Sequence, residues 1–406
     1  MAQQSAPTGG PPSPEGKPTA ARRGFLRLAG GTIAAIAVGG AVVGDVLASE
    51  RGVFASGSGD AYAAWDAWQR GAPPLRLVRA AILAANAHNS QPWLFSLGRQ
   101  RIDVFDDRAR GLGTIDPYRR EMHLSVGAAV ENLVLAARAS GLAPDVTLGP
   151  IGGNQTHLAA IELRSGARDV SELYRAIPRR HTDRGDYVKG RRLPADVARS
   201  MQALADRPDI RIVWLLAPGQ MADFANLTVA ATEAFVADTD QATDDYAWYR
   251  GSWAAVQKHK DGVTLDAAGL SPLMRSLGKL TPSTREQNGE YWVSSTKDRQ
   301  LPTAAGFGIV VVPDAANPTQ RVAAGRYYQR VHLWATAHGL ALQPLNQSVE
   351  RAERERSTTG PGEMSRALAR LVGDTGWQAV MPFRIGYPTA TALPSPRRPI
   401  DEVVRG

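Results

Sequence analysis

The stretch GAAVENLVLAARASGLA, from Gly127 to Ala143, returns in altered form as GRYYQRVHLWATAHGLA, from Gly325 to Ala341. The two stretches lie 198 positions apart and are identical at seven of seventeen positions, including the first glycine and the closing Gly-Leu-Ala. Apolar residues recur at helical spacing, and the glycine near each end suits a left-handed helix cap. The repeat therefore predicts two long helices of one kind in a single chain.

The elements around each long helix repeat as well. A predicted strand follows each helix, at 158–164 and at 380–385. A helix-to-strand unit precedes each, at 75–97 and at 194–216. The order helix, strand, long helix, strand thus occurs twice, which predicts an α+β fold with internal pseudo-symmetry.

Composition narrows the possible functions. The chain has 406 residues, of which 43% are hydrophobic and 21% charged, so a disordered or fibrous chain is not expected. It contains no Cys and only seven His, without an HxxxH pair, which excludes thiol chemistry and argues against a metal site. The net charge is +8, but no basic run with interleaved aromatic residues occurs, so nucleic-acid binding is not expected. An anionic cofactor or an acidic surface remains as a partner for the positive charge.

The first part of the chain has the pattern of an export signal. Within residues 1–48, Arg22 and Arg23 precede a short Gly- and Ala-rich apolar stretch, 28–44. This pattern is typical of a twin-arginine signal, whose partner is the export machinery that carries folded proteins. The stretch is short for a membrane-spanning helix, and an uncleaved anchor stays an alternative. The sequence thus predicts export to the periplasm, the cell envelope or the medium, with membrane attachment if the signal is not cleaved.

The rest of the chain is predicted to contain a linker, two halves and one insertion. The insertion lacks a counterpart in the first half and is rich in Tyr and Trp. These aromatic residues suit a lid over a substrate pocket, a cover over a cofactor, or the packing of a helical excursion. Its length favours the cover. The predicted bounds are 49–72 for the linker, 73–170 for the first half, 171–406 for the second half and 238–305 for the insertion.

Two loop motifs provide candidate site residues. Arg180, Thr182 and Arg184 alternate along the chain, so in an extended segment their side chains would project to one side. Two guanidinium groups and a hydroxyl suit a phosphate, although a solvated basic loop would show the same pattern. In the first half, Asn89 and Gln91 precede a proline that favours an extended backbone. Their amide groups could bind the polar edge of a heterocycle.

In their order along the chain, these motifs resemble those of the flavin-dependent nitroreductase superfamily. N-x-Q-P-W (89–93) follows an alanine-rich helix, and R-x-T-x-R (180–184) precedes another. A long helix ends in Gly-Leu (339–340), and IGYP (385–388) leads to PRRP (396–399). The resemblance covers most of the chain after the linker, and its specificity lies in the order of the motifs.

The resemblance implies a fold, a cofactor and a set of site residues. Family members form intertwined homodimers with two FMN sites, so this chain is similar to a dimer fused into one monomeric polypeptide with a single site. It resembles the branch of actinobacterial dormancy-associated nitroreductase-like proteins, with antiparallel or mixed sheets flanked by helices. The flavin would carry the chemistry, so no catalytic side chain is predicted. The implied FMN-binding residues are Asn89, Gln91, Arg180, Thr182, Arg184, Gly339, Leu340 and Arg397.

The implied function is an FMN-dependent oxidoreductase that reduces a small flat acceptor of nitroaromatic or quinone type. The export signal argues against part of this function, because NADPH is scarce outside the cytoplasm. A protein that sequesters flavin without turnover is therefore the alternative. The chain also departs from the family pattern at Asn86, where a serine is usual, and at His181, where many members have arginine. These departures leave the redox tuning of the flavin open.

Overall fold

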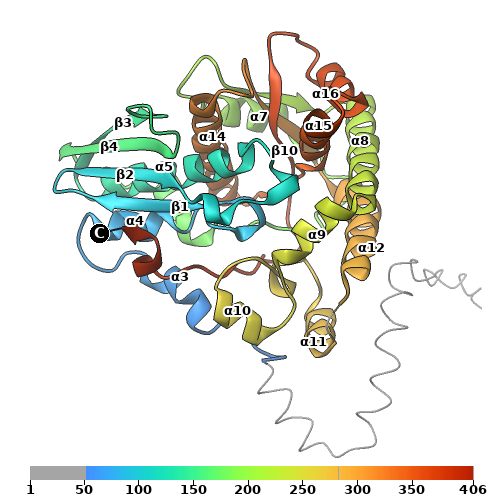
Figure 1. Ribbon diagram of the computed structural model, residues 1–406, viewed down its shortest axis with the longest axis horizontal. Helices are drawn as coiled ribbons and strands as arrows, with labels where there is room; N and C mark the ends of the chain where they lie inside the picture. The colour runs from blue at the N-terminus through green and yellow to red at the C-terminus, as the bar shows by residue number, and fades with distance from the viewer. Residues whose placement is uncertain (1–51, 282, 406) are drawn as a thin grey trace, which may run out of the picture. The chain divides into compact units, whose positions relative to one another are not determined.

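The computed structural model describes residues 52–281 and 283–405, which belong to one compact unit (Figure 1). The predicted twin-arginine signal, 1–48, lies outside the described residues. Among the described helices, none combines the length and the apolar character needed to cross a membrane.

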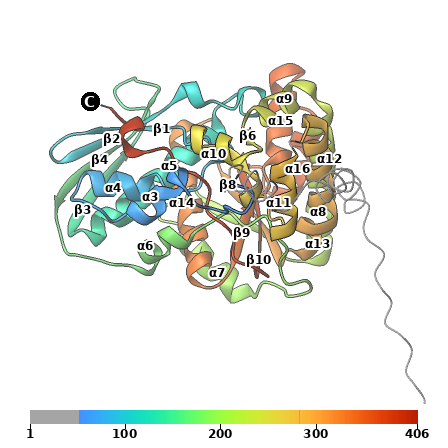
Figure 2. The same ribbon diagram turned by 90° about the horizontal axis from the view of Figure 1, so that it is seen from below.

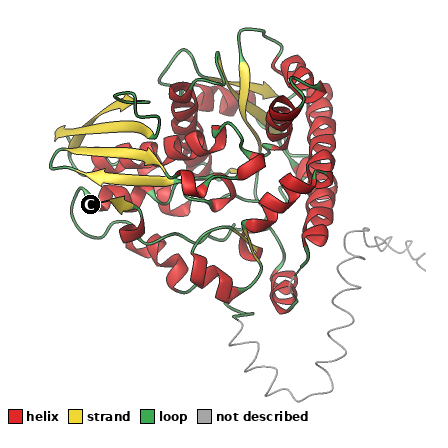
Figure 3. Cartoon of the chain, in the orientation of Figure 1, coloured by secondary structure: helices red, strands yellow, loops and turns green. Residues whose placement is uncertain are grey.

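Two sheets, one from each half, repeat the same antiparallel strand order (Figure 3). The first sheet contains β1-β2-β4-β3 and the second β5-β8-β10-β9, so strands with the same place in the chain take the same place in the sheet. In each half the long helix follows the second strand. This shared topology confirms the predicted α+β fold with two related halves. The elements are β1 (Trp93–Leu97), β2 (Arg101–Asp106), α5 (Arg120–Ala139), β3 (Leu142–Leu148) and β4 (His157–Ser165) in the first half, and β5 (Arg211–Leu215), β8 (Gly306–Val312), α14 (Pro318–Ala337), β9 (Ala341–Pro344) and β10 (Gln378–Gly386) in the second.

The long helices α5 and α14 pack closely against each other between the two sheets (Figure 1). A Cβ atom at Gly127 would collide with the carbonyl oxygen of Val322, and one at Gly325 would collide with that of Leu124. Gly127 therefore faces the residue three positions before Gly325, and Gly325 faces the residue three positions before Gly127. Such reciprocal contacts are typical of a twofold interface. The repeated glycines of the sequence mark this helix crossing.

Each half has its own hydrophobic core, and segments pass between the halves. The first core lies between α5 and the first sheet, and the second between α14 and the second sheet. The last strand, β11 (Val404–Arg405), returns to the first sheet and pairs in parallel with β1. The halves are thus intertwined. Shorter helices outside the sheets are α3 (Ala63–Ala67), α4 (Leu75–Ala81), α6 (Glu172–Ala176) and α7 (Ala195–Gln202).

The second half carries two helical excursions where the first half has short connections (Figure 2). The first excursion, 216–305, joins β5 to β8, and the second, 345–377, joins β9 to β10. The predicted insertion, 238–305, falls within the first excursion, which begins earlier because the 20-residue helix α8 also lacks a counterpart in the first half. Asp238, where the predicted insertion begins, caps the next helix of the excursion. The excursion helices are α8 (Pro218–Ala237), α9 (Thr239–Ala247), α10 (Trp253–His259), α11 (Pro272–Leu280), α12 (Arg285–Ser295) and α13 (Leu301–Thr303), then α15 (Gln347–Thr358) and α16 (Glu363–Val372); β6 (Tyr249–Arg250) and β7 (Val263–Thr264) form a small parallel pair.

Candidate functional site

A cavity of about 240 Å³ lies where the helix crossing meets the first excursion. The loop 85–88 of the first half forms one part of its lining, and α5 and α14 contribute Leu124 and Tyr328. The first excursion contributes aromatic residues, among them Tyr249 and Trp292. The cavity therefore lies between the two halves and is closed on one side by a segment that only the second half has.

Thr182 and Arg184, two of the predicted FMN-binding residues, line this cavity. The Nη1 of Arg184 donates a hydrogen bond to the carbonyl of Ala267, at 3.1 Å. Burial lowers the pKa of Arg184. Within the described residues its guanidinium forms no ion pair, so the wall of the cavity carries a positive charge without a counter-ion.

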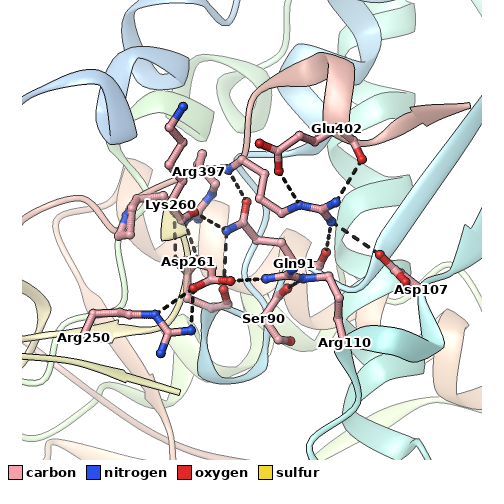
Figure 4. Close-up of polar contacts among 12 residues, drawn as sticks. Ser90, Gln91, Asp107, Arg110, Arg250, Lys260, Asp261, Arg397 and Glu402 are labelled. Atoms are coloured by element: carbon pink, nitrogen blue, oxygen red, sulfur yellow. Dashed lines mark hydrogen bonds and ion pairs between the residues drawn. The ribbon is translucent and has the colours of Figure 1, made fainter. Parts of the chain in front are cut away.

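Asn89 and Gln91 do not line the cavity, and hydrogen bonds within the protein engage their amide groups; Figure 4 shows those of Gln91. Asn89 Nδ2 donates to the carbonyl of Pro396 at 2.9 Å, and its Oδ1 accepts from Arg397 Nη1 at 2.7 Å. Gln91 Nε2 donates to the carbonyl of Lys260 at 2.9 Å. The amide of Asn89 thus joins the first half to the C-terminal segment, and that of Gln91 joins it to the first excursion. Their contact with the edge of a flavin ring stays a prediction.

Arg180 and Arg397 form a buried cationic pair behind the cavity. Arg180 Nη2 donates to the carbonyl of Leu83 at 3.1 Å, and Arg397 Nη2 donates to that of Ala84 at 3.2 Å. These carbonyls follow the C-terminal end of α4, where the helix dipole favours a cation. Burial lowers the pKa of Arg180 to about 10, and burial and the charge of Arg180 lower that of Arg397 well below its ordinary value. The Nε of each is buried without a hydrogen-bond partner in the described part of the chain.

Gly339 and Leu340 lie away from the cavity. Gly339 has a φ of 71° just after the end of α14, and Leu340 packs in the second core. The cavity is lined instead by the middle of α14, at Gly325 and Tyr328. The Gly-Leu pair serves to cap the helix, and its contact with a cofactor stays a prediction.

A buried acidic cluster at the N-terminal end of α5 is absent from the sequence-based predictions. Glu121 and Glu350 line the cavity, and Asp116 and Glu353 are buried with them. Arg120 is fully buried and pairs with Glu121 at 3.1 Å and with Glu353 at 3.0 Å. Burial and the neighbouring carboxylates raise the pKa of Asp116 to about 7 and that of Glu350 well above its ordinary range.

The sequence offers no local signal for this cluster. Its members come from α5, from the turn just before α5 and from α15, which lies far away in the chain. Taken alone, each of these segments has the charge pattern of an ordinary solvated segment. A second pair that the predictions lack is His88 with Asp245, whose Nε2 and Oδ1 atoms are 2.8 Å apart. Among the described residues, no group of three or more His, Asp or Glu is arranged to hold a metal ion.

No family model matches the chain. A putative NAD(P)H nitroreductase of Mycobacterium tuberculosis, found in two strains, is 26% identical over 337 residues, which cover 81% of this chain and 90% of the relative. This similarity supports a place in the nitroreductase superfamily.

Two solved nitroreductase structures are similar in part. One is a nitroreductase with bound FMN from Desulfitobacterium hafniense, 14% identical with a TM-score of 0.34. The other is an FMN-dependent nitroreductase from Mycobacterium smegmatis in complex with NADPH, 16% identical with a TM-score of 0.36. Each similarity covers 58% of this chain, and 98% and 97% of the respective neighbour. At such TM-scores these two structures do not describe the site of this chain. The support for a nitroreductase-like protein comes from the Mycobacterium tuberculosis relative, which is similar in sequence.

The cavity lining combines a cation with carboxyl groups. Arg184 supplies the cation, and Arg180 and Arg397 bind the carbonyls of Leu83 and Ala84 just before the lining residue Ala85. Glu121 and Glu350 supply the carboxyl groups. Such a lining can hold an anionic group of a ligand and exchange protons.

Proposed function

We propose that this chain binds FMN in the cavity at the helix crossing and acts as a nitroreductase-like oxidoreductase on a flat acceptor of nitroaromatic or quinone type. The observation that carries the proposal is the positive charge of Arg180, Arg184 and Arg397, for which the described residues provide no carboxylate partner. A buried guanidinium without a counter-ion is costly, so an anionic ligand is expected beside these groups. The phosphate of FMN is such an anion, and the sequence relative is named an NAD(P)H nitroreductase.

The residues around the cavity fit this cofactor. Thr182 and Arg184 line the cavity and would hold the phosphate. Arg180 and Arg397 would add positive potential from behind, and their buried Nε–H groups still lack acceptors within the described residues. The apolar surface of the crossing and the aromatic residues of the first excursion suit a flat ring system.

When bound, FMN supplies two-electron redox chemistry. The chain's own residues bind the phosphate, orient the flat ring between the two halves and exclude water with the first excursion. On this proposal the protein leaves the cytoplasm folded, with its cofactor, by the twin-arginine route that Arg22 and Arg23 suggest.

Sequestration of FMN without turnover is a second candidate. It is favoured by the contacts that hold the first excursion over the cavity. Asp244 accepts hydrogen bonds from the backbone N and the Oγ1 of Thr114, at 2.7 and 2.6 Å, and Asp245 contacts His88 at 2.8 Å. An excursion fixed in this way to the first half would keep a bound cofactor from exchange with solvent.

One set of measurements tests the site and separates the two candidates. The purified full chain is expected to be yellow, or to become yellow with added FMN. Arg184→Ala should weaken FMN binding about tenfold to a hundredfold, because a charge-assisted hydrogen bond is lost. Arg199→Ala, an exposed arginine on α7, is the matched control. Unchanged FMN affinity in Arg184→Ala, with the fold retained by circular dichroism, would refute the phosphate assignment.

Anaerobic mixing with NADPH or a deazaflavin donor then distinguishes turnover from storage. Bleaching of the visible flavin absorbance, followed by recovery when a quinone is added, supports the oxidoreductase. A colour that persists with every donor supports sequestration. A colourless protein that takes up no FMN would refute both.

A further inference from the structure

The cavity contains a pair of groups that the proposed cofactor site does not use. His88 belongs to the 3-10 turn Ala87–Asn89 of the first half, and Asp245 belongs to α9 of the first excursion. Both line the cavity, and His88 Nε2 lies 2.8 Å from Asp245 Oδ1. The side chain of His88 is 13% exposed. The pair therefore joins the two segments at the wall of the cavity, largely shielded from water.

The surroundings of His88 favour the charged imidazolium. Burial opposes the charge, but the hydrogen bond to Asp245 and the charge of that carboxylate outweigh burial and raise the pKa of His88. Glu121, on α5, adds to the rise, and Arg184 acts against it. Asp245 engages Nε2, whereas no hydrogen bond within the described residues uses Nδ1. The Nδ1–H group can therefore be donated to a ligand in the cavity.

A second acidic group lies close to this pair. Glu121 and Glu350 both line the cavity, and Arg120 pairs with Glu121 at 3.1 Å. Burial and the charge of Glu121 raise the pKa of Glu350.

The rest of the lining suits a flat ligand. Tyr249, Tyr291 and Trp292 come from the first excursion, and Leu124 and Ala128 come from α5. Aromatic faces and small apolar side chains bind planar rings, while the few polar groups set the orientation of the ring. Among the polar groups of this cavity, His88 can donate a proton, which suits an acceptor whose oxygen atoms become hydroxyl groups on reduction.

We propose that His88, held by Asp245, donates a proton to a carbonyl oxygen of a quinone-type acceptor bound in this cavity. The inference rests on the proposed function, because the two electrons come from reduced flavin, and the proton released on flavin oxidation passes to solvent. One O–H bond of the product forms as the Nδ1–H bond of His88 breaks. The other forms with a proton from solvent. The product is the hydroquinone, and solvent returns a proton to His88.

Asp245 acts as a positioning residue for His88. Its carboxylate fixes the orientation of the imidazole ring and stabilises the positive charge before the transfer, as a carboxylate does for the base of a catalytic triad. Because Asp245 comes from the first excursion, the proton donor is complete only when this segment lies against the first half. The first excursion would thus contribute to the chemistry as well as cover the cavity.

The first test is a titration that needs no turnover. The ring signals of His88 can be assigned by NMR from their absence in His88→Gln, and their pKa is expected to lie above the ordinary value of about 6.5. Asp245→Asn should lower it. His259→Gln, an exposed histidine on α10 of the same excursion, is the control and should leave the titration unchanged. A His88 pKa that Asp245→Asn does not lower would overturn the proposal.

The second test separates the two half-reactions. In His88→Gln, oxidation of the reduced flavin by menadione should be about a hundredfold slower, since a positioned proton donor is lost. Flavin reduction by dithionite should keep its wild-type rate. The oxidation rate of the wild type should fall as pH rises through the pKa of His88, and that of the variant should not. An oxidation rate that His88→Gln leaves unchanged would overturn the proposal.

Menadione binding to the flavin-free full chain distinguishes this inference from the proposed function. Followed by tryptophan fluorescence, its affinity should weaken about tenfold as pH rises through the pKa of His88, because the charged donor is lost. His88→Gln should show no such change. A protein that takes up no FMN but shows this pH dependence would refute the proposed function and support His88 as the donor. Uptake of FMN without the pH dependence would refute His88 alone.

Discussion

The two related helices α5 and α14 are alike at their middle and different at their N-terminal ends. At the crossing, Gly127 and Gly325 make the same contact with the opposite backbone. At the ends, Asp116 and Asp314 occupy equivalent positions, but Asp116 is buried and caps α5, whereas Asp314 is exposed and Asn317 caps α14. The helix contact that joins the two halves is symmetric. The polar groups at the N-terminal ends of the two helices are not. The cavity lies beside the altered end.

The same contrast holds for the connections between strands. In the first half, β1 and β2 are joined by a tight hairpin, whereas the first excursion takes this place in the second half. The excursion supplies Asp245 and the aromatic residues of the cavity. The first half in turn supplies His88 and Glu121. The candidate site therefore depends on residues that differ between the two halves. Substitutions at the helix crossing test the part that the halves share, and substitutions at the N-terminal end of α5 and in α15 test the part in which they differ.

The largest effect is expected for Arg120→Met, at the altered end of α5. Arg120 is the cation that pairs with Glu121 and Glu353, so its loss leaves buried carboxylates without a partner. We expect a loss of about 3–5 kcal/mol in the free energy of unfolding at pH 7, measured by urea denaturation. Arg138→Met, exposed on the same helix, should change it by less than about 0.5 kcal/mol. A loss below about 1 kcal/mol for Arg120→Met would show that the cluster is neutralised by protons instead.

The next effect tests the symmetric part. Gly127→Ala and Gly325→Ala should each lower the free energy of unfolding by about 2–3 kcal/mol, because the added methyl group meets backbone that cannot move easily. Gly219→Ala, at an exposed site on α8 with open space around it, should have no destabilising effect. If one crossing glycine tolerated alanine and the other did not, the two halves would not be equivalent at their contact.

A smaller effect is expected for Glu350→Gln, and its sign depends on pH. Because the folded protein raises the pKa of Glu350, stability from this group is present below the ordinary pKa of about 4.3 and is lost as pH rises toward the folded value. Glutamine mimics the protonated form. The variant should match the wild type near pH 4 and become more stable than it at alkaline pH.

Thermal unfolding between acid and alkaline pH measures this difference. Glu233→Gln, exposed on α8, should follow the wild type throughout. If Glu350→Gln kept the pH dependence of the wild type, the carboxyl of Glu350 would already be ionised in the folded protein.

Packing was easier to predict from the sequence than the site. The repeat predicted the two long helices, and the structure shows that its glycines lie where the backbones of these helices come into close contact. The alternation of Arg180, Thr182 and Arg184 was less informative. Arg180 still belongs to the turn that ends the 3-10 helix Ile177–Arg179, since its N–H bonds to the carbonyl of Ala176 at 3.0 Å. Its side chain therefore enters the protein while the other two line the cavity.

The groups that the sequence did not reveal are those whose character arises from tertiary contact. His88 and Asp245 are far apart in the chain, and neither lies in a pattern that marks a pair. Glu350 belongs to α15, which is polar along most of its length and is typical of a solvated helix. Burial and the nearby charge of Glu121 raise the pKa of its carboxyl.

Strand β11 has a consequence for the order in which the protein can fold. Val404 pairs with Phe95 of β1, so the first sheet takes its last strand from the opposite end of the sequence. During synthesis the ribosome releases β1 long before it releases this partner, and domains usually fold as units in the order in which they emerge. The edge of the first sheet at β1 therefore stays open until Val404 and Arg405 have been made. A chain that stopped before Val404 would lack the strand that closes this edge.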